Sequence, residues 1–527
     1  MPARRPALLA AAVGILSSGV VTLVMLWPAL GSGYLLYRDF ITVPDPALSP
    51  RTWGMTGSAP RAVPLDGVMA VLDPVVPTWL QQKLILLGCL WLGGSGIAVL
   101  LRHRGTVAAA LGGIVGTWSP FATERLLLGQ APTLLAWSML PWLVMASRRS
   151  GHARSRVVLV TLAALPAALT PSGGLTAAAA AVVLSVLARR RRRETLAVIG
   201  LGLIWCLPWL VPAVGGRSGA GVAEGAAAFR VDAPGLSGVL DVLGGGGVWA
   251  DGAGLASRDH PVAGAATVVL LLLASVGLSA FSRPHRRLLG LALLLPPVVV
   301  LVLASPFGLA AFAAAQSVPG VALFRDTHRL LALSSFVLAV LAPVGVVRVV
   351  QRLGQHGSGG PRAFRLTVSA SAACAGAAVV ILAAPDAPPR LHGAYHPVDF
   401  PSDWGRVVAL VADESTVVLP WQPMRRTAWN AERPFLDPLP LALPGDVIAA
   451  TDLVVERDGQ RFNVGSGDPS RTAGWLEGRL DLAELDTLGV KVVVEWRQSP
   501  GRPVSAEALE TLQLISETTT FRVWRVR

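Results

Sequence analysis

Residues 102–149 read RHRGTVAAALGGIVGTWSPFATERLLLGQAPTLLAWSMLPWLVMASRR, and this stretch contains the pattern that decides the fold. Two apolar runs, 105–118 and 133–147, are each followed or preceded by an arginine-rich gap, and the segment between them carries Glu124. Arginine-rich gaps stay on the cytoplasmic side of a membrane. The stretch therefore predicts two membrane helices that are joined on the outer side by an acid-bearing turn.

The same alternation extends over residues 1–384. The short basic gaps contain a single acid, Glu194, whereas the gaps between them hold the other eleven acids of this region, from Asp39 to Asp326. Basic gaps lie at Arg4/Arg5, Arg102/Arg104, 148–156, 189–193, 283–287 and 348–365. About eleven spans are predicted: 7–29, 83–101, 105–118, 133–147, 157–169, 173–188, 195–214, 264–281, 288–304, 330–347 and 366–384.

The basic gap at Arg4/Arg5 places the N-terminus in the cytoplasm. Because the number of spans is odd, residues 385–527 then lie on the outer side of the plasma membrane. The first apolar run is longer than a signal peptide and has no clear cleavage site, so we expect it to be retained. Composition agrees, with 53% hydrophobic residues, 15% charged residues and a mean hydropathy of +0.57. The predicted fold is a polytopic α-helical domain, 1–384, followed by an extracytoplasmic mixed α/β domain, 385–527.

The formal net charge of +13 is unevenly distributed along the chain. Residues 1–384 contain 30 Lys and Arg against 12 acids, a net +18, and the tail contains 15 against 20, a net −5. The basic excess suits the lipid surface and gives no case for nucleic acid. Cys89, Cys206 and Cys374 all lie inside predicted spans, so the tail forms no disulfide, and no zinc spacing is present.

Four outer segments interrupt the spans: 31–82, 119–132, 215–263 and 305–329. Loop 31–82 is rich in aromatic and apolar residues, which argues against disorder. Segment 215–263 contains Gly244 to Gly247 and is expected to be mobile, as a lid would be. In the tail we expect strands at 417–421, 490–496 and 518–526 and helices at 403–412 and 505–515.

Three charged groups fall on the predicted outer side. Carboxylates at a membrane boundary can act as general bases toward a sugar hydroxyl, and arginines can hold a phosphate through paired hydrogen bonds. Together they suit transfer of a sugar from a lipid phosphate to an outward-facing acceptor. The groups are Arg38, Asp39 and Asp45 after the first span, Glu124 and Arg125 after the third, and Arg325, Asp326, His328 and Arg329 before the tenth.

This layout resembles the GT-C class of polyprenyl-phosphate-dependent glycosyltransferases. Within it, Pro120-Phe121-x-x-Glu124-Arg125-Leu126-x-x-Gly129-Gln130 resembles a loop of actinobacterial arabinofuranosyltransferase-like membrane proteins, with Ser119 in place of an expected Asn. The resemblance implies a polyprenyl-phosphate sugar donor, of arabinofuranosyl or mannosyl type, and a cell-envelope glycan or glycolipid acceptor. Asp39 corresponds to the first-loop catalytic acid, with Asp45 and Asp73 as rivals.

The remaining site residues follow from these roles. Glu124 is a further catalytic candidate, and the cations around the donor phosphate would be Arg38, Arg125, Arg325, His328 and Arg329. Trp53, Trp79 and Trp421 could stack on acceptor sugars, although aromatic residues of small domains more often form the core. No cofactor is implied, and a divalent cation is compatible with the chemistry. The competing readings are a non-catalytic GT-C-like scaffold that acts through its exported domain, and a transporter.

Overall fold

The computed structural model describes residues 4–55, 62–215, 224–250, 252–316, 318, 320–355, 362–450, 454–457, 460–464, 475, 482–505 and 512–526. The chain forms two compact units, and each is built from separate stretches of sequence. Unit 1 comprises residues 1–27, 85–206 and 223–393, and unit 2 comprises residues 28–84, 207–222 and 394–527. The expected domain boundary at residue 384 is based on the predicted side of the membrane, whereas the two units are defined by contacts within the structure. That boundary therefore stays a prediction.

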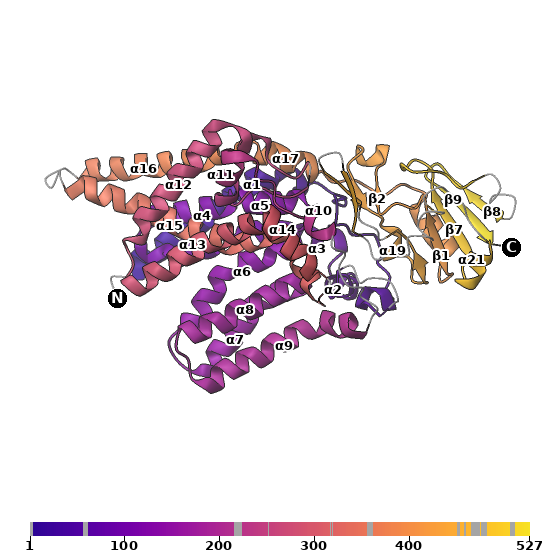
Figure 1. Ribbon diagram of the computed structural model, residues 1–527, viewed down its shortest axis with the longest axis horizontal. Coiled ribbons are helices and arrows are strands. Elements are labelled where there is room, and N and C mark those ends of the chain that lie inside the picture. Colours follow the sequence, from indigo (N-terminus) through magenta and orange to yellow (C-terminus); the bar gives the residue numbers. More distant parts are fainter. Residues whose placement is uncertain are drawn as a thin grey trace. The chain divides into compact units, whose positions relative to one another are not determined.

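A helix covers each of the eleven hydrophobic stretches expected from the sequence (Figure 1). Their bounds are α1 (Arg4–Leu26), α3 (Thr78–Leu101), α4 (Thr106–Thr117), α6 (Ala131–Arg148), α7 (Ala153–Ala164), α8 (Pro171–Leu187), α9 (Arg192–Gly215), α12 (Pro261–Leu278), α13 (Arg283–Ala304), α15 (Leu331–Gln355) and α16 (Arg362–Ala383).

Not all of these helices have the length and hydropathy that a full membrane crossing requires. Among the described residues, six helices are long and apolar enough to cross: α1, α3, α9, α12, α13 and α15. A seventh candidate is α16 together with α17 (Ala387–Ala394), a pair bent by 55°. Helices α4 and α7 have 12 residues each, so each rises about 18 Å against a hydrocarbon core of roughly 30 Å. The chain is a membrane protein, and the expected count of about eleven spans is not confirmed.

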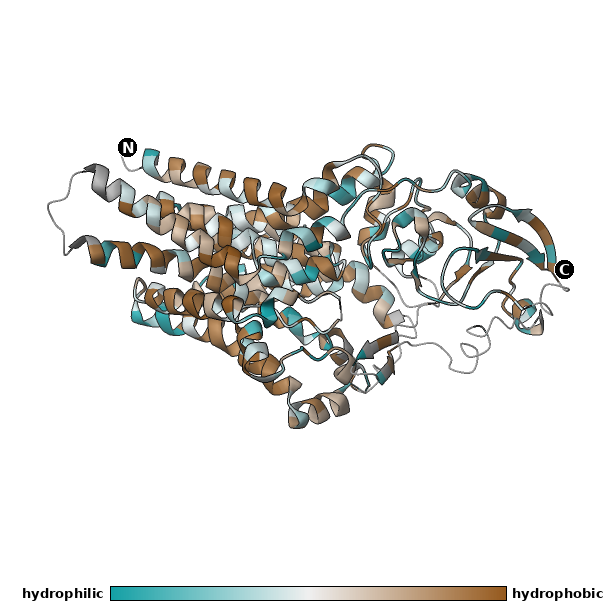
Figure 2. Cartoon of the chain, turned by 90° about the horizontal axis from the view of Figure 1, so that it is seen from above, coloured by the Kyte–Doolittle hydropathy of each residue, from teal (hydrophilic) through white to brown (hydrophobic). Residues whose placement is uncertain are grey.

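Hydrophobic residues run along the helices of unit 1, as Figure 2 shows. Along α13, Leu291 and Leu294 leave more than half of their side chains exposed, which suits contact with lipid. Helix α4 packs against α1, α15 and α16, while α12 packs against α15 and α16. Gly277 of α12 and Gly345 of α15 lie so close to the opposite backbone that a side chain at either would collide with a carbonyl.

Short helices occupy the segments between the long ones. The predicted break after residue 118 is present, because Trp118 leaves helical geometry and α5 (Pro120–Leu127) begins at Pro120. Segment 305–329 forms α14 (Pro306–Ala315) and the short 3-10 helices η6 (Val321–Phe324) and η7 (Thr327–Leu330).

Segment 215–263 is described except for 216–223 and residue 251. It contains α10 (Glu224–Ala228), α11 (Gly235–Leu243) and the 3-10 helix η5 (Ala256–Asp259). Gly244 to Gly247 are buried, and Gly245 lies against Phe121 and Ser335. These glycines allow the backbone to enter the helix core. The expectation that the segment is mobile, as a lid would be, stays a prediction.

Unit 2 is built around a five-stranded mixed sheet in the order β4-β1-β7-β9-β8. Strand β1 is parallel to β4 and β7, and the other pairs are antiparallel. Helix α18 (Trp404–Val411) packs its apolar face into this core. The strands are β1 (Thr416–Leu419), β4 (Val447–Ile448), β7 (Val492–Trp496), β8 (Leu512–Glu517) and β9 (Phe521–Val526).

The expected strands coincide with β1, β7 and β9, and the expected helix at 403–412 coincides with α18. The expected helix at 505–515 is wrong at its end, where β8 pairs with β9; residues 506–511 lie outside the described part. Helical spacing in this segment is overridden by pairing along the sheet edge.

Loop 31–82 belongs to unit 2, where it contributes to the core. Leu36, Ile41 and Val43 are buried in the same cluster as Trp404 and Phe435. Asn430 Nδ2 donates to the carbonyl of Leu36 at 3.1 Å. Residues 31–55 and 62–82 therefore form ordered structure, which includes η2 (Pro50–Trp53) and α2 (Leu65–Leu72).

Candidate functional site

The break between α4 and α5 places two charged side chains inside unit 1. Pro120 starts α5, and one turn later Glu124 and Arg125 are almost completely buried. Arg125 Nη2 lies 2.8 Å from Asp326 Oδ2, and it also contacts Gln130 Oε1. A buried charge needs such a partner. The ion pair therefore joins α5 to the turn before η7, about two hundred residues later in sequence.

This turn carries a row of cations. Arg329 Nε donates to Asp326 Oδ2 at 3.1 Å, while 34% of the Arg329 side chain stays exposed. Arg325 is partly exposed, and its guanidinium lies 4.7 Å from the ring centre of Phe229. Burial opposes ionisation of Asp326, but the charges of Arg125 and Arg329 outweigh it and lower the pKa of Asp326 to about 2. Asp326 thus stays charged and holds two arginines in place.

His328 points into the interior from the same turn. Its Nε2 lies 3.4 Å from Glu124 Oε2, and its ring stacks on Phe121 with centres 5.4 Å apart. Glu124 Oε2 also accepts the backbone N–H of Val248 at 3.0 Å. Neither Glu124 nor His328 reaches the surface of the described chain. The catalytic role of Glu124 and the donor-phosphate role of His328 stay predictions.

A second ion pair of unit 1, between Arg258 and Asp241, lies close to Glu124. Arg258 of η5 contacts Asp241 of α11 at 2.5 Å, and its Nη1 donates to Thr267 Oγ1 at 3.0 Å and to the carbonyl of Ala383 at 2.9 Å. Burial, followed by the charge of Glu124, raises the pKa of Asp241 to about 7, against the opposing effect of Arg258. Asp241 is one of the eleven acids of the predicted outer gaps, and Arg258 is not among the predicted site residues. In the sequence, the only local indication of this ion pair is one acid within an apolar helix.

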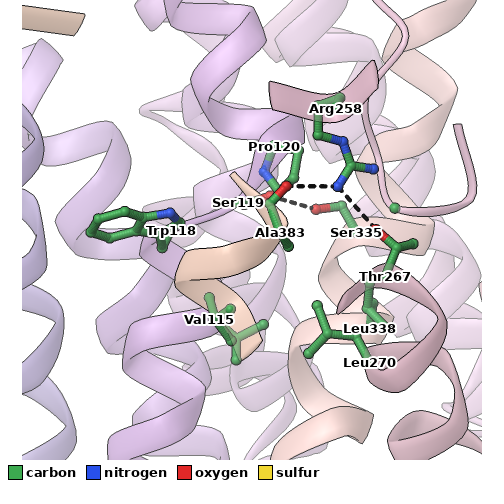
Figure 3. Close-up of a pocket in the computed structure, with 12 residues that line it drawn as sticks. Val115, Trp118, Ser119, Pro120, Arg258, Thr267, Leu270, Ser335, Leu338 and Ala383 are labelled. Carbon is green, nitrogen blue, oxygen red and sulfur yellow. Dashed lines mark hydrogen bonds between the residues drawn. The ribbon is translucent and has the colours of Figure 1, made fainter. Parts of the chain in front are cut away.

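Arg258 and Thr267 line a small cavity (Figure 3). Its volume is about 20 Å³, enough for about one water molecule. Ser119 Oγ lies 3.0 Å from Ser335 Oγ on one wall, and Arg258 and Thr267 form another. Ser119, which replaces the expected Asn, does not cap α5 with its side chain but pairs with α15.

The other predicted site residues lie in unit 2. Asp39 and Asp45 are exposed, and Arg38 is partly exposed. Arg38 and Asp45 have φ values of 48° and 46°, a conformation that non-glycine residues adopt at an energetic cost. The structure brings Glu124, Arg125, Arg325, His328 and Arg329 together in unit 1. The catalytic role of Asp39 stays a prediction.

The three tryptophans expected to bind the acceptor are all at least partly buried. Trp421 is buried edge-on against Trp475, with ring centres 4.6 Å apart. Trp53 packs over Gly67 of α2, and Trp79 lies 4.8 Å from the ammonium of Lys83. Their role toward an acceptor remains a prediction.

Among the described residues, no group of three or more His, Cys, Asp or Glu side chains could hold a metal ion. Of the three cysteines, Cys89 and Cys206 are buried and Cys374 is exposed.

The fold is similar to that of the arabinofuranosyltransferase AftD from Mycobacteria. The TM-score is 0.57 at 15% sequence identity, and the similarity covers 97% of this chain and 41% of that chain. An oligosaccharyltransferase from Archaeoglobus fulgidus gives a TM-score of 0.42 at 10% identity, covering 92% of this chain and 69% of that chain. No family model and no curated protein matches the sequence. The chain thus shares the fold of AftD at low sequence identity, and it spans less than half the length of the AftD chain.

Proposed function

We propose that this chain is a membrane glycosyltransferase. It would move a sugar, of arabinofuranosyl or mannosyl type, from a polyprenyl-phosphate donor to a cell-envelope glycan or glycolipid on the outer face of the plasma membrane. The observation that carries the proposal is the pair Arg325 and Arg329, partly exposed cations on a turn that is fixed from inside by the Arg125–Asp326 ion pair. The similarity to AftD in fold supports the same reading.

The reaction breaks the bond between the anomeric carbon and the phosphate oxygen, and an acceptor hydroxyl forms the new bond. Negative charge then collects on the departing lipid phosphate, where a planar guanidinium can hold two oxygens at once. Cations that are already in place stabilise this charge without rearrangement. Arg329 meets this condition because Asp326 fixes its Nε and leaves part of the group free toward solvent.

The proton of the acceptor hydroxyl must pass to a base, and we assign this role to Asp39, with Asp45 and Asp73 as rivals. Asp39 and Asp45 are exposed acids of unit 2, so each can meet a substrate in water. Glu124 and His328 are proposed to be positioning residues, since both are buried against each other.

The test is transfer by the purified full chain with a panel of radiolabelled polyprenyl-phosphate sugars. Arg329→Ala should lower kcat by roughly a hundred-fold if the guanidinium stabilises the leaving phosphate, and Asp39→Asn should abolish transfer. Arg287→Ala, which removes an exposed arginine at the start of α13, is the matched control and should transfer normally. Wild-type rates in both Arg329→Ala and Asp39→Asn would refute the site.

A second candidate function is a non-catalytic scaffold that retains the transferase fold. The buried network favours it in one respect, because Arg125 and Asp326 form a buried ion pair and Glu124 is buried against His328, an arrangement that structural groups also adopt. A scaffold would show no transfer with any donor of the panel, while cells lacking the protein would still lose envelope glycan. Restoration of the glycan by the Asp39→Asn variant would then identify the scaffold.

A further inference from the structure

Two turns of unit 1 lie side by side although they are about forty residues apart in sequence. One joins α6 to α7 and the other joins α8 to α9 (Figure 1), and α6 packs against both α7 and α8. Arg190 Nη2, in the second turn, donates to the carbonyl of Ser147 at the end of α6 at 2.7 Å. The two turns therefore form one continuous surface.

This surface, called the basic surface below, is densely charged. Its only acid within 148–156 and 189–194 is Glu194, which is buried and bound by both Nε and Nη2 of Arg156 at 2.7 Å. That ion pair is neutral and fastens the start of α9 to α7. The exposed arginines of the basic surface are Arg148, Arg149, Arg154, Arg189, Arg191, Arg192 and Arg193.

Arg190 differs from the exposed arginines around it. It is partly buried, with one guanidinium nitrogen on Ser147, and its buried Nε has no hydrogen-bond partner among the described residues. Arg189 adopts a left-handed conformation, with a φ of 50°, where α8 ends. The backbone therefore turns sharply and directs this run of arginines outward. A phosphate can satisfy several such donors together.

The surroundings of the basic surface indicate what covers it. Large apolar side chains are exposed within about two turns of the arginines: Val158 on α7, Val186 on α8 and Leu196 on α9 each leave more than half of their surface uncovered. A band of exposed apolar side chains directly beside arginines matches hydrocarbon next to phosphate head groups. A soluble acidic protein would cover the arginines but gives no reason for the apolar band.

We propose that the basic surface binds the phosphate groups of anionic phospholipids of the bilayer, with Arg190 at its centre. This requires only that both turns meet the same membrane surface, which their contact ensures, and it does not depend on transferase activity. The bound lipids would hold α6 to α9 at a fixed depth. Anionic phosphatidylglycerol should therefore bind more tightly than zwitterionic phosphatidylcholine.

The experiment is a titration of the detergent-solubilised full chain with phosphatidylglycerol, followed by native mass spectrometry to obtain the Kd of the retained lipids. Neutralising three exposed arginines, as Arg191→Gln, Arg192→Gln and Arg193→Gln together, should raise this Kd by roughly a hundred-fold, since each surface arginine contributes roughly five-fold. Arg190→Lys keeps the charge but loses the planar fork, so it should bind more weakly than wild type.

The matched control removes three exposed arginines elsewhere: Arg283→Gln, Arg286→Gln and Arg287→Gln at the start of α13. This variant should retain the lipid as wild type does. A variant that keeps the charge, with Arg191→Lys, Arg192→Lys and Arg193→Lys together, should keep most of the affinity for phosphatidylglycerol. An equal loss in the control triple would show diffuse charge attraction and overturn the proposal. Equal wild-type affinity for phosphatidylglycerol and phosphatidylcholine would do the same, and would direct attention to an acidic protein. Circular dichroism and melting temperatures of each variant identify any that fail to fold.

Discussion

Two aspartates of unit 1, the buried Asp326 and the mostly buried Asp241, have pKa values that are shifted in opposite directions. Asp326 faces two arginines, which lower its pKa to about 2 although burial opposes this. Asp241 faces one arginine, and burial together with the charge of Glu124 raises its pKa to about 7. An unfolded aspartate has a pKa of about 4. The two groups therefore make folding depend on pH with opposite signs.

The first prediction concerns Asp241. Between about pH 4 and pH 7 the unfolded chain has lost this proton while the folded chain keeps it, so rising pH favours unfolding across that window and has no further effect above it. The melting temperature of wild type relative to Asp241→Asn should fall from pH 5 to pH 7 and then level off. A difference that stays constant over this range would contradict the assignment. Asp326→Asn is the control, because its contribution is complete above about pH 4 and is lost only toward pH 2.

The second prediction concerns the Arg125–Asp326 ion pair. Removing one partner leaves the other charge buried, so Arg125→Met should lower the free energy of unfolding by about 3–5 kcal/mol. Removing both, as Arg125→Met with Asp326→Leu, should recover part of this loss, because no unpaired charge of the pair remains. Denaturation of Arg125→Met, of Asp326→Leu and of the double variant in detergent measures the coupling. Strictly additive effects would show that the two residues do not act as a pair.

At the scale of elements, helices α12 and α15 of unit 1 approach each other closely at two glycines, where a side chain is missing. Gly277 of α12 faces the carbonyl of Leu341, and Gly345 of α15 faces that of Leu273. In a membrane such small residues allow backbone contact, which replaces the hydrophobic effect as a source of association. Gly200 of α9 has open space around its Cα, although it lies on an apolar helix of similar length.

The third prediction compares these glycines. Gly277→Ala should destabilise the chain by about 1–3 kcal/mol, because the added methyl group meets backbone that cannot move aside. Gly200→Ala should be neutral or stabilising by about 0.5–1 kcal/mol, since alanine favours a helix over glycine. Thermal unfolding of both variants tests the pair, and an equal shift in both would show that helix propensity, not contact, governs the response.

The sequence was most informative for elements whose environment is uniform. A long apolar run must become a helix in lipid, and each predicted span coincides with one. It was least informative where a distant partner decides: the end of the expected helix at 505–515 belongs instead to β8 (Leu512–Glu517), because β9 offers an unpaired edge. Glu124 and Arg125 could be predicted as site residues because they are charged residues in an apolar stretch. Arg258 could not, because nothing in the neighbouring sequence shows that it contacts Asp241, Thr267 and Ala383.

At the scale of the whole molecule, each compact unit is assembled from segments far apart in sequence. Unit 2 unites the loop after the first helix with the C-terminal region, and Leu36, Ile41 and Val43 from the loop share a core with Val418 of β1. Neither part can complete that core alone. The stability of the sheet should therefore depend on a loop that precedes it by hundreds of residues.

The last prediction tests this dependence. Val43 is fully buried in the shared core, so Val43→Ala should cost about 2 kcal/mol of local stability. Hydrogen exchange of the amides of β1 and β7 should then become about thirty-fold faster in the intact chain. Val75→Ala is the matched control, since Val75 belongs to the same loop but is 81% exposed and should leave exchange unchanged. Unaltered exchange of β1 in Val43→Ala would mean that the C-terminal sheet is stable without the contact that Val43 makes. Faster exchange of β1, with exchange in the helices of unit 1 unaffected, would establish the loop as part of the domain that it precedes.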